Sequence, residues 1–250
     1  MTATTYIALT LAAILLLTMP VFAIVSRNRP MDADVARRPT TVLLGYWVRD
    51  WVMWVIAPLE RTLVAWRVSP DVFNYLGVVL GIVAGVAYAH CSLAAAGWLV
   101  LLGGLADIMD GRIARARGLA SKYGEFLDSM LDRFSEAFVF VGLAFCFEGS
   151  AVAAAGLLLA LGASMLVSYA RAKGAVVGID CRGGVMQRAE RLVILAVASL
   201  IDGPVTSAFD WRPGTLLLVA IWVIGVGALG TAIYRTAYIA RALRGEEASR

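Results

Sequence analysis

The chain has 250 residues, of which 60% are hydrophobic and only 16% are charged. Its mean hydropathy of +0.79 excludes an ordinary soluble domain and predicts an integral membrane protein. The net charge of +4 is compatible with a nucleic-acid binder, but the Lys and Arg residues fall between the apolar runs, as topology signals do. We therefore expect no nucleic-acid partner and no separate soluble domain.

The first apolar run, within "TYIALTLAAILLLTMPVFAIVSRNR", predicts a transmembrane helix. No positive charge precedes this run, whereas Arg27 and Arg29 follow it, which reverses the charge order of a signal peptide. We predict an uncleaved helix whose N-terminus lies outside. The later segment "LLGYWVRDWVMWVIAPLERTLVAWR" interleaves tryptophans with charged residues and predicts an interfacial helix.

Six further apolar runs predict transmembrane helices at about residues 72–90, 94–111, 125–147, 152–173, 188–203 and 213–240. Basic residues concentrate at 27–67, 112–122, 171–191 and 235–250, segments that share one side if all seven predicted helices cross. That side is predicted to be cytoplasmic. We expect an all-α polytopic membrane bundle, in which residues 1–68 form the N-terminal transmembrane helix and interfacial helix, 69–243 a six-helix core, and 244–250 a cytoplasmic tail.

The three cysteines, Cys91, Cys146 and Cys181, are scattered singly along the sequence. They have neither metal-ligand nor disulfide spacing, so we expect all three to be small apolar packing residues. The only histidine, His90, is expected to be an interfacial polar residue rather than a ligand.

Two pairs of aspartates lie at the ends of predicted transmembrane helices. Asp107 and Asp110 are three residues apart, and Asp128 and Asp132 are four apart, so each pair lies on one helix face. The short connection between the helices makes them neighbours. Each carboxylate near the hydrocarbon costs about 2.5–3.5 kcal/mol, so four without compensation would cost roughly 10 kcal/mol or more. A cation is therefore expected between them, and oxygen ligands favour a hard divalent ion such as Mg²⁺.

Small and basic residues surround these carboxylates. Gly111 follows Asp110 directly and Gly124 opens the next helix, so a bulky ligand can approach the backbone closely. The neighbouring basic residues are Arg112, Arg115, Arg117 and Lys122. A metal beside arginine indicates a phosphate ligand, although all of these except Arg115 are interpreted as ordinary positive-inside residues.

The segment "DIMDGRIARARGLASKYGEFLDSMLD" is similar, without a gap, to the signature of the CDP-alcohol phosphotransferase family, which reads DxxDGxxAR, eight residues, GxxxDxxxD. The matching positions are Asp107, Asp110, Gly111, Ala114, Arg115, Gly124, Asp128 and Asp132. The resemblance implies a membrane enzyme that transfers the lipid phosphate of CDP-diacylglycerol to an acceptor hydroxyl and releases CMP.

The same resemblance implies roles for the signature residues. Asp107, Asp110 and Asp128 would bind one or two divalent ions, Mg²⁺ or alternatively Mn²⁺, and Asp132 would complete this metal site and act as the general base. The CDP-lipid would be contacted by Asp107, Gly111, Ala114, Arg115 and Gly124.

A second segment, "SYARAKGAVVGIDCRGGVMQRAERLVIL", resembles the corresponding region of phosphatidylinositol phosphate synthases and their archaeal lipid counterparts. Those enzymes use inositol 1-phosphate as the acceptor. The resemblance implies that Arg171, Arg191 and Arg235 bind the acceptor phosphate, and charges at the last two positions would be expensive inside apolar runs without a function. Arg182 and Arg188 are interpreted as cytoplasmic flank charges.

Several alternatives stay open from the sequence. One alternative is a phosphatidyltransferase whose acceptor is glycerol 3-phosphate or an unphosphorylated alcohol. Another is a cation transporter that uses the intramembrane aspartates. Family resemblance implies a homodimer, and the glycine-rich run "LGVVLGIVAGVAYA" offers either a dimer contact or packing within one protomer. The expected location is the cell membrane, with the active site facing the cytoplasm and membrane lipids around the helices.

Overall fold

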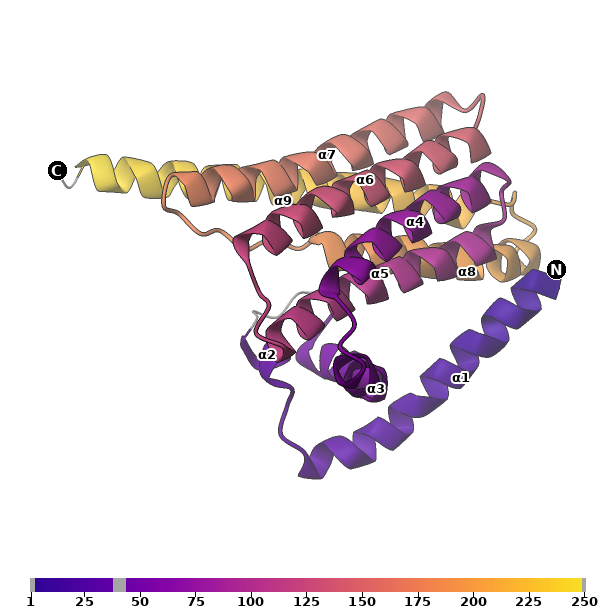
Figure 1. Ribbon diagram of the computed structural model, residues 1–250. Helices are drawn as coiled ribbons and strands as arrows, with labels where there is room; N and C mark the ends of the chain where they lie inside the picture. The colour runs from indigo at the N-terminus through magenta and orange to yellow at the C-terminus, as the bar shows by residue number, and fades with distance from the viewer. Residues whose placement is uncertain (1–2, 38–43, 249–250) are drawn as a thin grey trace.

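The computed structural model describes residues 3–37 and 44–248, and the described chain is helical with short connections (Figure 1). The helices are α1 (Ala3–Val25), the 3-10 helix η1 (Ser26–Asn28), α2 (Ala33–Arg37), α3 (Tyr46–Ala65), α4 (Pro70–Ala89), α5 (Leu93–Ala116), α6 (Lys122–Cys146), α7 (Ala151–Val176), α8 (Arg188–Ala208) and α9 (Thr215–Ala248). Helices α4 to α9 form the bundle, which confirms the predicted all-α six-helix core. Helix α9 continues into the segment predicted to be a cytoplasmic tail, as far as Ala248.

Six described segments are long and apolar enough to cross a membrane. They are Thr10–Asn28, Pro70–Ala89, Leu93–Ala116, Ala151–Val176, Arg188–Ala208 and Thr215–Gly245. The seventh predicted transmembrane helix is α6, which has 25 residues and lies inside the bundle beside α4 (Figure 1). Helix α6 is not among the six apolar segments because it carries four charged residues, Asp128, Asp132, Arg133 and Glu136.

Polar residues define where several helices begin. The Oγ atoms of Ser121 and Ser150 accept hydrogen bonds from backbone N–H groups in the first turns of α6 and α7. Pro70 is the first residue of α4, where its fixed φ suits a helix and its missing N–H removes no bond. These caps fix the turns at both ends of the bundle.

Glycines bring α4 and α6 into direct backbone contact. A Cβ atom on Gly142 would collide with the carbonyl oxygen of Gly85, and one on Gly81 would collide with Ser135. Only glycine therefore permits this spacing. The glycine-rich face of α4 thus packs within the protomer, so it gives no support to the predicted homodimer.

The prediction that all three cysteines are packing residues is wrong for two of them. Cys91 and Cys146 form a disulfide across 55 residues of sequence, whereas Cys181 is free and buried, as expected. The pair joins the α4–α5 turn to the end of α6. Because α4 and α6 run side by side and end together, tertiary packing creates a pairing that cysteine spacing does not reveal.

The N-terminal helices lie on one side of the bundle, where α1 and α3 both contact α5. In Figure 1, α1 diverges from the bundle, and α3 is viewed nearly end-on between α1 and α5, so α3 runs across the direction of the bundle helices. Phe22 of α1 is fully buried against the rings of Trp47 and Trp54, and Trp51 Nε1 donates to Thr18 Oγ1 at 2.9 Å. This arrangement agrees with a crossing helix followed by an interfacial helix.

Candidate active site

Three signature aspartates meet at one end of the bundle. Asp107 comes from α5, and Asp128 and Asp132 come from α6; one carboxylate oxygen from each lies within 4.8 Å of the others. Asp110 lines the same cavity, is almost completely buried, and accepts a hydrogen bond from the N–H of Gly111. The two pairs predicted from sequence spacing line one cavity. The prediction that the short connection makes α5 and α6 neighbours is wrong, because α4 packs against both helices and lies between them (Figure 1).

The cavity around these aspartates is lined by several oxygen atoms that could bind a metal ion. Its other lining residues include Phe73, Asn74, Gly103, Ser135 and Arg188. Asn74 is 7% exposed, and its Oδ1 atom is buried without a hydrogen-bond partner. An acceptor oxygen among carboxylates can be satisfied by a cation, by a water molecule or by a hydrogen-bond donor of a ligand. The residues present therefore fit a hard divalent ion such as Mg²⁺ or Mn²⁺.

Arg188 belongs to this cluster, and its interpretation as a flank charge is wrong. Its Nη1 lies 3.1 Å from Asp107 Oδ1 and its Nη2 lies 2.7 Å from Asp132 Oδ1. The side chain reaches the aspartates because α8 packs against α5. A sequence signal exists in its spacing from Arg191, since residues three apart share a helix face.

Arg191 is buried in an ion pair with Glu136 of α6. The two side chains form a bidentate contact, with Nε to Oε1 at 2.9 Å and Nη2 to Oε2 at 3.1 Å, and they are only 4% and 8% exposed. The remaining nitrogen, Nη1, is buried without a partner. Sequence reasoning missed Glu136, which lies 55 residues away along the chain.

Arg235 and Arg171 lie at the same end of the bundle. Arg235 is buried and donates from Nε to the carbonyl of Gly183 at 2.8 Å and from Nη1 to that of Val167 at 2.9 Å. Arg171 is exposed on α7, one turn beyond Val167. Arg171 and Arg191 both lie near enough to Arg235 to interact with it electrostatically, and Arg191 is neutralised by its pairing with Glu136.

Four of the residues predicted to contact a CDP-lipid lie around the α5–α6 connection. Gly111 lies beneath Arg115, because a Cβ at this position would be 3.1 Å from Arg115 Nη1. Ala114 and Gly124 are partly buried, and the Gly124 N–H donates to Ser121 Oγ at 3.1 Å. Arg115 is 41% exposed and its Nη2 donates to Asp34 Oδ2 at 2.8 Å.

The neighbouring basic residues have specific partners as well. Arg112 binds Asp32 and Glu60 of the N-terminal region, so its interpretation as a simple topology residue is incomplete. Arg117 donates to the carbonyls of Arg67 and Val68 at the end of the α3–α4 connection. These contacts join the signature helix to segments that precede the six-helix core.

Comparison with known proteins identifies a family whose sequence model matches this chain. The sequence model of the CDP-alcohol phosphatidyltransferase family matches residues 67–234. A phosphatidylinositol phosphate synthase of Streptomyces avermitilis is 32% identical over 226 residues, which cover 87% of this chain and 89% of the relative. An archaetidylinositol phosphate synthase of Methanothermobacter thermautotrophicus is 35% identical over 130 residues, covering 52% and 65% respectively.

Solved structures of Mycobacterium tuberculosis phosphatidylinositol phosphate synthase share the fold. The structure with CDP-DAG bound superimposes with a TM-score of 0.64 at 27% identity and covers 73% of this chain and 92% of that chain. The complex with manganese and citrate gives the same TM-score and identity and covers 73% and 87%.

Proposed function

Because the chain belongs to the CDP-alcohol phosphatidyltransferase family and is a multi-pass membrane transferase, we propose that it transfers a phosphatidyl group from CDP-diacylglycerol to a small phosphorylated polyol. Inositol 1-phosphate is the acceptor that we favour, since relatives that match most of the chain are phosphatidylinositol phosphate synthases. Glycerol 3-phosphate and unphosphorylated alcohols are the alternatives. Family membership leaves no role for the cation-transporter alternative.

The cluster of Asp107, Asp128 and Asp132 is the observation that carries this proposal. Together with the manganese complex of a solved relative, it indicates a divalent metal cofactor, and we propose Mg²⁺ as the ion. Asp107, Asp110 and Asp128 would hold it, and Asp132 would border it. A bound ion would neutralise the negative charge of the pyrophosphate, as phosphoryl transfer requires.

Asp132 is the proposed general base. The acceptor oxygen bonds to the lipid-linked phosphorus while the bond from that phosphorus to the CMP oxygen breaks, and the hydroxyl proton passes to the Asp132 carboxylate. Arg188 contacts both Asp107 and Asp132, so we assign it the role of holding these two carboxylates in position. CMP and the new phospholipid are the products.

The two substrates would be bound by two different sets of residues. Gly111, Ala114, Arg115 and Gly124, together with Asp107, would contact the CDP-lipid. Arg171, Arg191 and Arg235 would bind the acceptor phosphate, because guanidinium groups form charge-assisted bonds with phosphate oxygens. The unpartnered Nη1 of buried Arg191 supports this assignment, since it is a donor that a phosphate can satisfy.

The proposed location is the cell membrane, with the active site at the cytoplasmic face. Basic residues gather at the end of the bundle that holds the aspartates, as the positive-inside rule requires. The Cys91–Cys146 disulfide lies at the opposite end, and disulfides are typical of the oxidising exterior. A homodimer remains a proposal from family resemblance, to be tested by cross-linking in native membranes.

Release of CMP from CDP-diacylglycerol by the purified protein in lipid nanodiscs tests the proposed function. We expect turnover with inositol 1-phosphate, its loss after chelation with EDTA, and its recovery with Mg²⁺. Glycerol 3-phosphate, free inositol and serine serve as competing acceptors. Preferential use of an unphosphorylated alcohol would overturn the acceptor assignment, and the lack of turnover with every acceptor would overturn the transferase assignment.

A further inference from the structure

The segment between α1 and α3 contacts the helix that carries half of the signature. This acidic elbow, residues 29–36, contains Asp32 and Asp34 and includes most of α2. It lies beside the C-terminal end of α5 (Figure 1). The elbow precedes residue 67, where the family match begins, so it lies outside the matched core.

Arg112 is the anchor for the elbow. Its Nη1 and Nη2 lie 3.2 and 3.0 Å from the two carboxylate oxygens of Asp32, and its Nε lies 2.6 Å from Glu60 of α3. Burial alone would raise the pKa of Asp32, but the hydrogen bond and charge of Arg112 outweigh burial, and the pKa lies below its ordinary value. Asp32 is therefore charged at neutral pH, and Arg112 is fully occupied.

The elbow backbone is held in place by α3 as well. Asp50 of α3 accepts hydrogen bonds from the backbone N–H of Asp32 at 2.9 Å and from Arg29 at 3.2 Å. The N–H of Asp34 in turn donates to Asp32 Oδ1 at 2.9 Å. These contacts hold the backbone at Asp34, and Arg112 Nη1 lies 3.7 Å from Asp34 Oδ2, so Asp34 is positioned by more than Arg115.

Asp34 uses this fixed position to hold Arg115. Its Oδ2 lies 2.8 Å from Arg115 Nη2, and the guanidinium also lies against the bare backbone of Gly111, directly after Asp110. One nitrogen edge of Arg115 is therefore restrained, while the side chain stays 41% exposed. The N–H groups that Asp34 does not use are available to a ligand at the aspartate cluster.

We propose that Asp34 is a positioning residue that holds Arg115 ready for the phosphates of the CDP-lipid. The proposal rests on the proposed function, which assigns Arg115 to the CDP side of the site. A free arginine loses rotamer freedom when it binds phosphate, and an arginine that is already restrained loses less. The N-terminal extension would thus contribute to donor affinity without contacting the reacting atoms.

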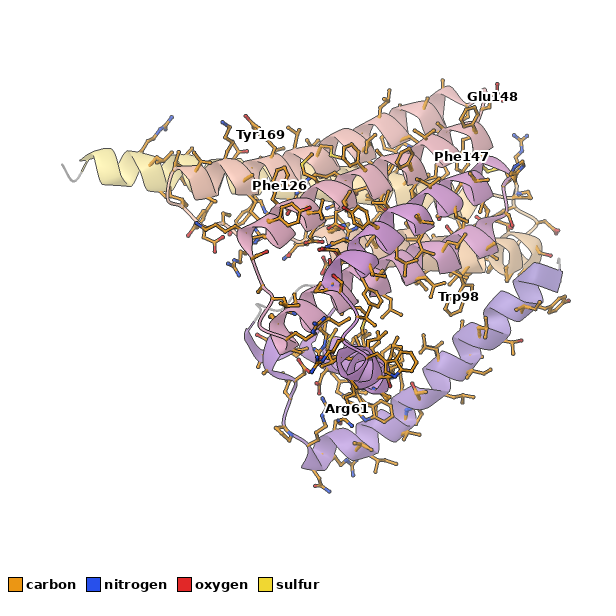
Figure 2. The ribbon with its side chains drawn as sticks, viewed as in Figure 1. Arg61, Trp98, Phe126, Phe147, Glu148 and Tyr169 are labelled. Carbon is orange, nitrogen blue, oxygen red and sulfur yellow. A yellow bond between two sulfur atoms is a disulfide. The ribbon has the colours of Figure 1, made fainter. Side chains whose placement is uncertain are left out.

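The test compares Asp34→Ala with wild type in the nanodisc assay. We expect the KM for CDP-diacylglycerol to rise by about two- to tenfold, the range for ordering one long side chain, while kcat and the acceptor KM stay unchanged. Asp34→Glu should restore most of the affinity. The matched control is Glu148→Ala, which removes one exposed carboxylate at the far end of the bundle (Figure 2).

A double variant separates positioning from a general structural effect. If Asp34 acts through Arg115, then Asp34→Ala should add nothing to the KM of Arg115→Ala. An additive effect, an unchanged KM in Asp34→Ala, or a lower KM would overturn the proposal. A wild-type protein that releases no CMP would instead overturn the proposed function, while thermal unfolding of each variant in nanodiscs verifies that the extension remains folded.

Discussion

The two ends of the bundle differ in how their polar groups are satisfied. At the end that holds the aspartate cluster, several buried polar atoms lack hydrogen-bond partners. At the opposite end, buried Asp202 is hydrogen-bonded and a disulfide joins two segments. Among the described residues, buried side-chain atoms without a hydrogen-bond partner occur in Asn74, Ser164, Arg188, Glu190 and Arg191. All except Ser164 lie in the first turns of α4 and α8, at the charged end.

The opposite end is built differently. Asp202 of α8 is 1% exposed, and its two oxygens accept from the N–H groups of Gly214 at 2.7 Å and Leu217 at 3.1 Å, where α9 begins. The disulfide between Cys91 and Cys146 closes the same end. We infer from this difference that one end is arranged to bind ligands and that the other end stabilises the bundle.

Loss of one charged ligand at the aspartate end should have the largest effect on turnover and little effect on folding. We expect Asp107→Asn or Asp128→Asn to lower metal-dependent turnover by roughly a hundred- to a thousandfold, because the charge that holds the cation is removed. The melting temperature should not fall, since the remaining carboxylates repel one another less. Near-wild-type turnover of either variant at saturating Mg²⁺ would contradict the assignment of this end of the bundle to ligand binding.

Arg191 tests whether one residue at the charged end serves both function and folding. Arg191→Ala should weaken acceptor use by roughly ten- to a hundredfold, because a charge-assisted bond is lost. It should also destabilise the fold by about 3–5 kcal/mol, because Glu136 is left buried without its partner.

The control for Arg191 removes both charges of the pair. Arg191→Ala combined with Glu136→Gln should recover stability in thermal unfolding while acceptor KM stays high. If acceptor KM returned to the wild-type value in the double variant, the arginine would be structural alone.

The disulfide tests the opposite end. Replacing Cys91 and Cys146 together by serine should lower the free energy of unfolding by about 2–4 kcal/mol, as expected for a cross-link over a long loop. At temperatures where the variant is folded, kcat and both KM values should match wild type. A loss of turnover without a loss of stability would contradict the division between the ends.

Asp202 should give the smallest of these effects. Asp202→Ala leaves the N–H groups of Gly214 and Leu217 without their acceptor and should cost about 1.5–3 kcal/mol of unfolding free energy. Chemical denaturation measures this loss, with Glu148→Ala as the exposed control at the same end. Equal stability of the two variants would show that the cap is not needed.

Local sequence patterns predicted much of the architecture and part of the site. Apolar runs located the long apolar helices, and tryptophans alternating with charges located the separate helix α3. The prediction that the short connection makes α5 and α6 neighbours failed, because α4 packs between them. The three- and four-residue spacing of the aspartates correctly predicted that each pair shares a helix face, since all four line one cavity. These features depend on neighbours along the chain, so periodicity and spacing reveal them.

Only the tertiary structure decided which distant residues complete these local features. Packing of α8 against α5 brings Arg188 to Asp107, and packing of α4 beside α6 joins Cys91 to Cys146. The contact between Arg115 and Asp34 spans 81 residues and requires the N-terminal helices to fold back onto α5. Membrane insertion, the positions of the helices and the carboxylate pairs could be predicted from the amino-acid order, because each follows from hydrophobicity and helical period. The partners of those charges depend on how side chains from separate helices pack in three dimensions, and no local period encodes that arrangement.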